Sequence, residues 1–148
     1  MILLLPGCAS TPATESTVRY AVQGKYADVH EDIVQAVTNR GMVISAEFHI
    51  SDMLNRTGKD VGSDKKIYRH AQVILFCSAV ISRKAMEVDA HNTVFCPYGI
   101  AVYELQNEPG KIFVSYRKAP EVNNAQSRAA MDDVEKLLDG IARDATGK

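Results

Sequence analysis

The alternation of apolar and polar residues along the chain predicts five short strands. The strongest signal lies between Ile67 and Cys77, where the stretch from Ala71 to Phe76 is apolar except for Gln72, a pattern typical of a central strand. The last two strands are joined by a turn sequence, residues 107–110, and should form a hairpin. The predicted strands are 18–22, 42–50, 67–77, one that starts at Val94 or Tyr98 and ends at Leu105, and 111–117.

Helical spacing of apolar residues predicts three longer helices and one short one. The longer helices span 26–40, 79–88 and 125–145, and a short helical segment spans 51–58. Gly41 follows the first helix at the place of a left-handed C-cap, and Ser78 is suited to cap the start of the second. Residues 57–66 hold two glycines and a charge cluster, so we expect a solvated loop there.

The order of these elements predicts an α+β fold. Helices packed on one face of a single sheet of about five strands, mainly antiparallel or mixed, form a two-layer sandwich, and the final hairpin disfavours a three-layer α/β fold. The length of 148 residues suits one domain, which we assign to residues 18–148. The net charge of -1 and the lack of long basic runs exclude a concentrated positive surface, so we expect no nucleic-acid partner.

The start of the chain carries a possible export signal. Leu5-Pro6-Gly7-Cys8 resembles the lipobox of bacterial lipoproteins, in which the cysteine is lipidated. Residues 1–17 then read as a signal remnant followed by a flexible polar tether. This interpretation predicts a periplasmic lipoprotein that meets the membrane only through its anchor at Cys8. The alternative is a cytoplasmic protein with an apolar N-terminus.

Cys77 and Cys96 are the main candidates for chemistry, and three interpretations of the pair stay open. Lipidation of Cys8 would leave them as an even pair in an oxidising compartment, where disulfides persist. A disulfide requires Cα atoms within about 7 Å, which holds if the two strands that carry these residues are antiparallel. The other interpretations are two buried free thiols and a metal or haem site.

A metal site would need a third ligand. His91 lies in a loop five residues before Cys96, and with both cysteines it would form a set suited to zinc or copper. Axial haem ligation is also open, although covalent haem attachment is excluded because there is no C-x-x-C-H. Cys96 and His91 lack a recognisable orienting residue or oxyanion loop, so we predict no catalytic residues and favour a non-enzymatic protein.

The stretch that holds these cysteines resembles a known family. Phe76-Cys77-Ser78, the helix after it, and the sequence from Phe95 to Glu104 are similar to the domain-of-unknown-function 302 (DUF302) family over about residues 18–145. This chain differs from the commoner form, because Ser78-Ala79 follows Cys77 and Pro97 comes after Cys96. The resemblance implies a small α+β domain that can form a homodimer and has no agreed biochemical activity.

Three functional hypotheses follow. The first is a small lipid-anchored periplasmic domain that binds a ligand, metal, haem or partner near Cys77, Cys96 and His91. The second is a thiol–disulfide redox protein that uses Cys77 and Cys96. The third is an interaction or dimerisation domain in which the cysteines are purely structural.

Overall fold

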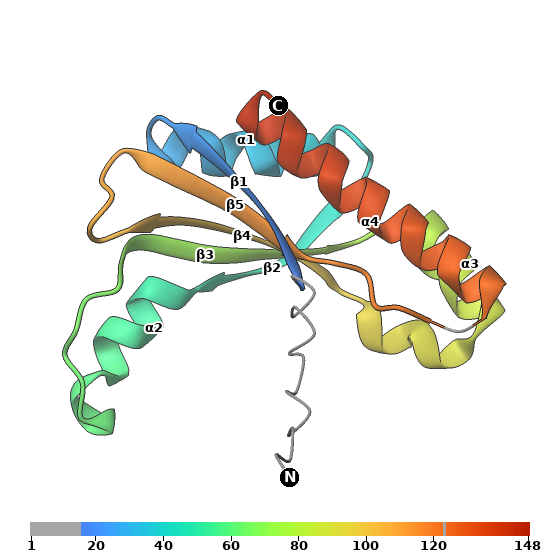
Figure 1. Cartoon of the computed structure of the whole chain (residues 1–148), viewed down its shortest axis with the longest axis horizontal. Coiled ribbons are helices and arrows are strands. Elements are labelled where there is room, and N and C mark those ends of the chain that lie inside the picture. Colours follow the sequence, from blue (N-terminus) through green and yellow to red (C-terminus); the bar gives the residue numbers. More distant parts are fainter. Residues whose placement is uncertain (1–15, 123) are drawn as a thin grey trace, which may run out of the picture.

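The computed structural model describes residues 16–122 and 124–148, which form a five-stranded sheet with helices packed against it (Figure 1). The strand order is β1-β5-β4-β3-β2, and every neighbouring pair is antiparallel. The lipobox-like residues and Cys8 lie outside the described residues. The elements are β1 (Thr17–Gln23), α1 (Tyr26–Thr38), β2 (Val43–His49), α2 (Ile50–Thr57), η1 (Lys59–Val61), β3 (Tyr68–Cys77), α3 (Ala79–Val88), η2 (Ala90–Phe95), β4 (Tyr98–Leu105), β5 (Lys111–Arg117) and α4 (Ala125–Thr146).

The predicted two-layer α+β sandwich is confirmed. α1 and α4 cover one face of the sheet, and α3 packs beside α4 past the end of the strands (Figure 1). α2 lies on the other side of the sheet, below it in this view. None of the helices in the described ranges is long and apolar enough to cross a membrane.

The hydrophobic core lies between the sheet and the two covering helices. Val29, Ile33, Ala36 and Val37 form the inward stripe of α1, as their spacing predicts. Fully burying a side chain of this size contributes about 1.5–3 kcal/mol. The strands supply their core residues at alternate positions, because successive side chains point to opposite faces of a sheet. These are Ile74 and Phe76 of β3, Ile100 and Val102 of β4, and Ile112 and Val114 of β5.

We call the sheet face turned away from α1 and α4 the open face. Its residues are those that alternate with the core positions of the strands. Aromatic residues are prominent on it, since Tyr103 of β4 stacks on Phe113 of β5 with ring centroids 5.2 Å apart. The open face comprises Arg19 and Ala21 of β1, Ala46 and Phe48 of β2, Ala71, Val73 and Leu75 of β3, Gly99, Ala101 and Tyr103 of β4, and Phe113 and Ser115 of β5.

Local signals place most element boundaries. Gly41 has a φ of 73°, the left-handed conformation expected after α1. Ser78 caps α3 by accepting a hydrogen bond from the N–H of Ile81 at 3.3 Å. The turn between β4 and β5 contains Gly110 at a φ of 79°. Of these positions, Ser78 lies beside the predicted cysteine site, since it directly follows Cys77.

Several details differ from the sequence-based prediction. α2 lies on the side of the sheet away from α1 and α4, whereas the helices are expected on one face (Figure 1). A register shift between Ile44 and Ala46 interrupts the pairing of β2 with β3, so strict alternation fails in β2. The segment after α3 is a short 3-10 helix, η2, instead of an irregular break. Asp89 caps η2, because its carboxylate accepts the N–H of His91 at 2.9 Å.

Candidate functional site

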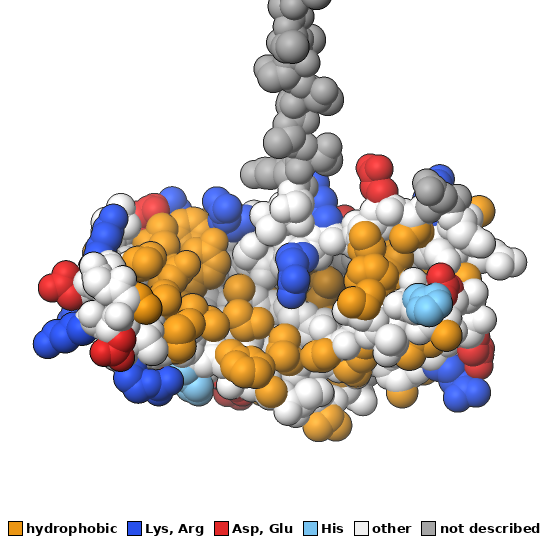
Figure 2. Space-filling model, turned by 90° about the horizontal axis from the view of Figure 1, so that it is seen from below, with side chains coloured by type: hydrophobic (Ala, Val, Ile, Leu, Met, Phe, Trp, Pro, Cys, Tyr) orange, Lys and Arg blue, Asp and Glu red, His pale blue; other side chains and the backbone are white. Residues whose placement is uncertain are grey.

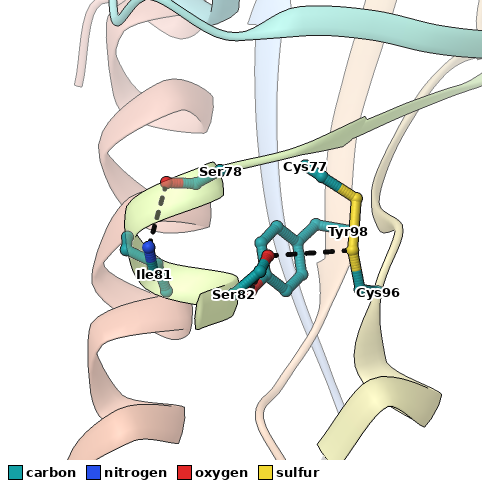
Figure 3. Close-up of a disulfide and its surroundings, with 6 residues drawn as sticks. All are labelled: Cys77, Ser78, Ile81, Ser82, Cys96 and Tyr98. Carbon is teal, nitrogen blue, oxygen red and sulfur yellow. Dashed lines mark hydrogen bonds between the residues drawn. A yellow bond between two sulfur atoms is a disulfide. The ribbon is translucent and has the colours of Figure 1, made fainter. Parts of the chain in front are cut away.

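Cys77 and Cys96 form a disulfide at one end of the sheet (Figure 3). Cys77 ends β3, and Cys96 lies between η2 and β4. β3 and β4 are antiparallel with Phe76 opposite Tyr98, so the end of one strand meets the beginning of the next. The Cα atoms of the two cysteines are 6.3 Å apart, within the range for a disulfide. Of the three interpretations of the pair, the disulfide is therefore the one present in the structure.

A hydroxyl group contacts one of the two sulfur atoms. The Oγ atom of Ser82, from α3, donates a hydrogen bond to the Sγ atom of Cys96 at 3.7 Å. The same Oγ atom lies 3.0 Å from the hydroxyl of Tyr98, from β4. Ser82 and Tyr98 are both buried, while both cysteines are half-buried. The two hydroxyls and the Cys96 sulfur thus form a short hydrogen-bonded chain (Figure 3).

The other sulfur belongs to the residue just before a helix. Cys77 precedes Ser78, the N-cap of α3, so it lies at the end of that helix where unpaired N–H groups gather. The N-terminus of a helix carries a partial positive charge that favours nearby anions, including thiolates. If the disulfide is opened, each sulfur therefore has a different source of stabilisation for its negative charge.

His91 is in η2 and is exposed, and its backbone N–H bonds to Asp89. Within residues 16–122 and 124–148, no three His, Cys, Asp or Glu side chains are grouped to hold a metal ion. The closed disulfide also uses both sulfurs, and a thiolate is the form that binds metal. The predicted ligand set Cys77, Cys96 and His91 stays a prediction for the reduced protein, as does axial haem ligation.

A cavity of about 230 Å³ opens beside the disulfide. Phe95 and Pro97, the residues on either side of Cys96, contribute to its wall, and so does Tyr98 of the hydrogen-bonded chain. The connector that follows β5 forms another wall, and α4 supplies its apolar floor. No sequence pattern indicated this cavity, because its walls come from segments that only the fold brings together.

Sequence reasoning also missed a polar cluster around Asp139 of α4. One carboxylate oxygen accepts hydrogen bonds from Tyr20 of β1 at 2.6 Å and Tyr116 of β5 at 2.9 Å, and the other accepts Arg143 at 2.6 Å. Partial burial raises the pKa of Asp139, but the hydrogen bonds from Tyr20, Arg143 and Tyr116 outweigh it and lower the pKa below its ordinary value. The bond to Asp139 raises the pKa of Tyr20, and burial raises that of Tyr116.

A second polar network lies where α1 meets β2 and β3. Tyr26 donates to Gln72 at 2.6 Å, and Gln72 donates to Glu47 at 3.1 Å. The imidazole of His30 contacts the same Glu47 oxygen at 2.9 Å, and the ring of His70 stacks on Tyr26. Burial raises the pKa of the Tyr26 hydroxyl, which keeps it protonated as a donor. We interpret this network as a structural link between the helix layer and the sheet.

The architecture and the site define a class of protein: a single α+β domain with an antiparallel sheet and a disulfide between β3 and the entry to β4. The family model "Domain of unknown function DUF302" matches residues 18–145, so the chain belongs to the DUF302 family. The resemblance inferred from the cysteine-containing stretch is confirmed.

A solved structure supports the same fold. The chain is similar to a protein described as "uncharacterized conserved protein DUF302 from Bacillus stearothermophilus", with a TM-score of 0.73 and 15% sequence identity. The similarity covers 89% of this chain and 99% of that one. No curated protein matches the chain. The comparisons thus establish the family and the fold, and the biochemical role has to be argued from the site itself.

Proposed function

We propose that this domain carries out thiol–disulfide exchange through Cys77 and Cys96. The observation that carries the proposal is the hydrogen bond from the Ser82 hydroxyl to the Sγ atom of Cys96, supported in turn by Tyr98. A hydrogen bond to a sulfur that becomes a thiolate stabilises the charged form. A hydrogen bond to a charged group contributes about 1.5–3 kcal/mol, whereas the helix N-terminus beside Cys77 contributes about 0.3–1 kcal/mol. The Cys96 thiolate is therefore the better stabilised of the two, so Cys96 is the better leaving group and a substrate thiolate attacks Cys77.

The exchange proceeds in two steps. A thiolate of a substrate dithiol attacks the Sγ atom of Cys77, the Cys77–Cys96 bond breaks, and its electron pair leaves on Cys96 beside the Ser82 hydroxyl. The second substrate thiol then loses its proton and attacks the substrate sulfur of the mixed disulfide, which releases Cys77 as a thiolate. Both cysteines end as thiols. Two electrons and two protons have moved from the substrate dithiol, now a disulfide, to the protein.

The test measures oxidation of a model dithiol peptide by the purified oxidised protein and by Ser82→Ala. Because a hydrogen bond to a charged group contributes about 1.5–3 kcal/mol, we expect the variant to react at least about tenfold more slowly. In the reduced protein, the pH dependence of Cys96 alkylation should also move to higher pH. Ser115→Ala is the matched control, because Ser115 bonds the carbonyl of Val18 and not a sulfur.

Two results would overturn this proposal. One is a wild-type disulfide that stays closed in mild reductant and oxidises no dithiol. The other is a Ser82→Ala protein that keeps the wild-type rate and pH profile while remaining folded. In either case the disulfide is structural, and the function lies elsewhere on the domain.

We further propose that the protein works in the periplasm, held to the membrane by a lipidated Cys8. The lipobox-like sequence Leu5-Pro6-Gly7-Cys8 supports this proposal. A second support is that disulfides persist in oxidising compartments such as the periplasm. Cell fractionation after metabolic labelling with a tritiated fatty acid tests this. The wild type should be labelled and sediment with membranes, and Cys8→Ser should lose both properties. An unlabelled wild type in the cytoplasmic fraction would contradict the assignment.

A second candidate function is self-association or partner binding through the open face. The observation that favours it is the apolar surface on the side of the molecule away from α1 and α4 (Figure 2). Phe48 on the edge strand β2 is 54% exposed, and Tyr103 lies further across the same face. Sedimentation equilibrium of the wild type and Phe48→Ser tests it. A wild-type homodimer that Phe48→Ser dissociates supports this function, and a monomeric wild type argues against the homodimer.

A further inference from the structure

The cavity beside the disulfide has apolar side chains from three separate segments: α4, η2 and the connector after β5. Met131, Val134 and Leu138 lie one to two turns apart on α4 and are buried. Val94 and Phe95 close the cavity from the η2 side. Apolar side chains that surround an open volume are typical of sites that take the hydrophobic part of a small ligand.

Two cationic residues that are adjacent in sequence also line this cavity. Arg117 ends β5 and Lys118 begins the connector to α4, and both are exposed. Neither forms an ion pair with a residue in the described part of the chain. The nearby carboxylate of Glu135 accepts a hydrogen bond from the N–H of Ala119 in this connector at 3.1 Å. Glu135 does not line the cavity beside the disulfide; it lines a neighbouring cavity together with Asp139.

The volume limits the size of the ligand. An apolar cavity of about 150 Å³ is large enough for benzene. At about 230 Å³, this cavity suits a body moderately larger than one benzene ring. A long fatty acid chain is too large to be enclosed, and a single metal ion or phosphate would leave the apolar walls without a partner.

We propose that this cavity binds a small organic monocarboxylate with an aromatic or branched apolar body. The body lies against Phe95 and the α4 floor, and the carboxylate meets Arg117 and Lys118. A carboxylate complements the two cations, and an apolar body complements the side chains of α4 and η2 that line the same cavity. This site is separate from the predicted set Cys77, Cys96 and His91, and it does not depend on thiol exchange.

The first experiment compares 3-phenylpropionate with 3-phenyl-1-propanol by isothermal titration calorimetry on the oxidised full chain. The two probes share their apolar body and differ in charge. We expect the carboxylate to bind about twofold to thirtyfold more tightly, because two exposed ion pairs together contribute about 0.4–2 kcal/mol. Equal affinities, or the absence of binding by the carboxylate, would overturn the proposal.

Variants then locate the binding. Arg117→Gln/Lys118→Gln should bring the affinity for the carboxylate down to that for the alcohol. The control Lys65→Gln/Lys66→Gln removes two adjacent charges from a distant exposed loop and should leave the affinity unchanged. Ala119→Phe places a ring at the cavity wall and should abolish binding of both probes. Wild-type affinity in the Arg117 and Lys118 variant, or loss of affinity in the control, would place the ligand elsewhere.

Discussion

Removal of the disulfide by Cys77→Ala/Cys96→Ala should cost stability by a predictable amount. The bond joins residues that are 19 positions apart, so it closes a loop of about 20 residues in the unfolded chain. The chain-entropy relation gives about 3 kcal/mol for a loop of that size. At this chain length, 1 kcal/mol corresponds to about 2–4 °C in Tm, so we expect the melting temperature to fall by roughly 6–12 °C.

Urea denaturation followed by circular dichroism provides the measurement. With a slope of about 1–3 kcal/mol per molar urea, the midpoint should fall by about 1–3 M. The reduced wild type should share the midpoint of the double variant, because both lack the same link. Cys8→Ser, which leaves this link in place, is the matched control and should keep the wild-type midpoint.

One result would refute this reasoning. If the oxidised wild type and the double alanine variant unfold at the same urea concentration with the same slope, the disulfide does not constrain the unfolded chain as assumed. An unchanged free energy of unfolding would also mean that the fold gives no thermodynamic preference for the oxidised pair, since the coupling between folding and disulfide formation is reciprocal.

Three further substitutions test other parts of the fold by urea denaturation. Asp139→Asn should lose about 1–3 kcal/mol at pH 7. Because the folded-state pKa of Asp139 is lowered, the difference should start to shrink as the pH falls below about 4 and vanish only below that lowered pKa; a pH-independent loss would contradict this. Asn124→Ala should cost about 1 kcal/mol by removing the N-cap of α4, and no loss would refute the capping role. Asn92→Ala should cost about 1–2 kcal/mol, because the buried amide donates to the carbonyl of Ala85; an unchanged midpoint would argue against that.

Most of the fold was predictable because its signals are local. The apolar run of β3, the turn before Gly110 and the stripes of α1 and α4 each identify an element within a few residues. The predicted hairpin also made an antiparallel sheet the economical arrangement. Antiparallel strands place Cys77 and Cys96 at the same end of the sheet, close enough for a disulfide, and the structure has them there.

The missed features depend on contacts between distant segments. Asp139 lies on α4, and only the pairing of β1 with β5 brings Tyr20 and Tyr116 together beneath it. Spacing along the chain carries no information about that pairing. The bonds of Ser82 to Cys96 and Tyr98 were missed for the same reason, since a serine in an amphipathic helix has no distinctive pattern.

The pairing of β1 with β5 also determines how the domain would bear a mechanical load. All seven residues of β1 face partners in antiparallel register, from Thr17 opposite Arg117 to Gln23 opposite Lys111. Tension applied at Thr17 along the strand axis would strain these backbone hydrogen bonds together in shear, and they would not open one by one. Near the middle of the strand, the Tyr20 hydroxyl adds a side-chain hydrogen bond to Asp139 of α4. The first strand is therefore suited to transmit a pull from its N-terminal end into the body of the sheet.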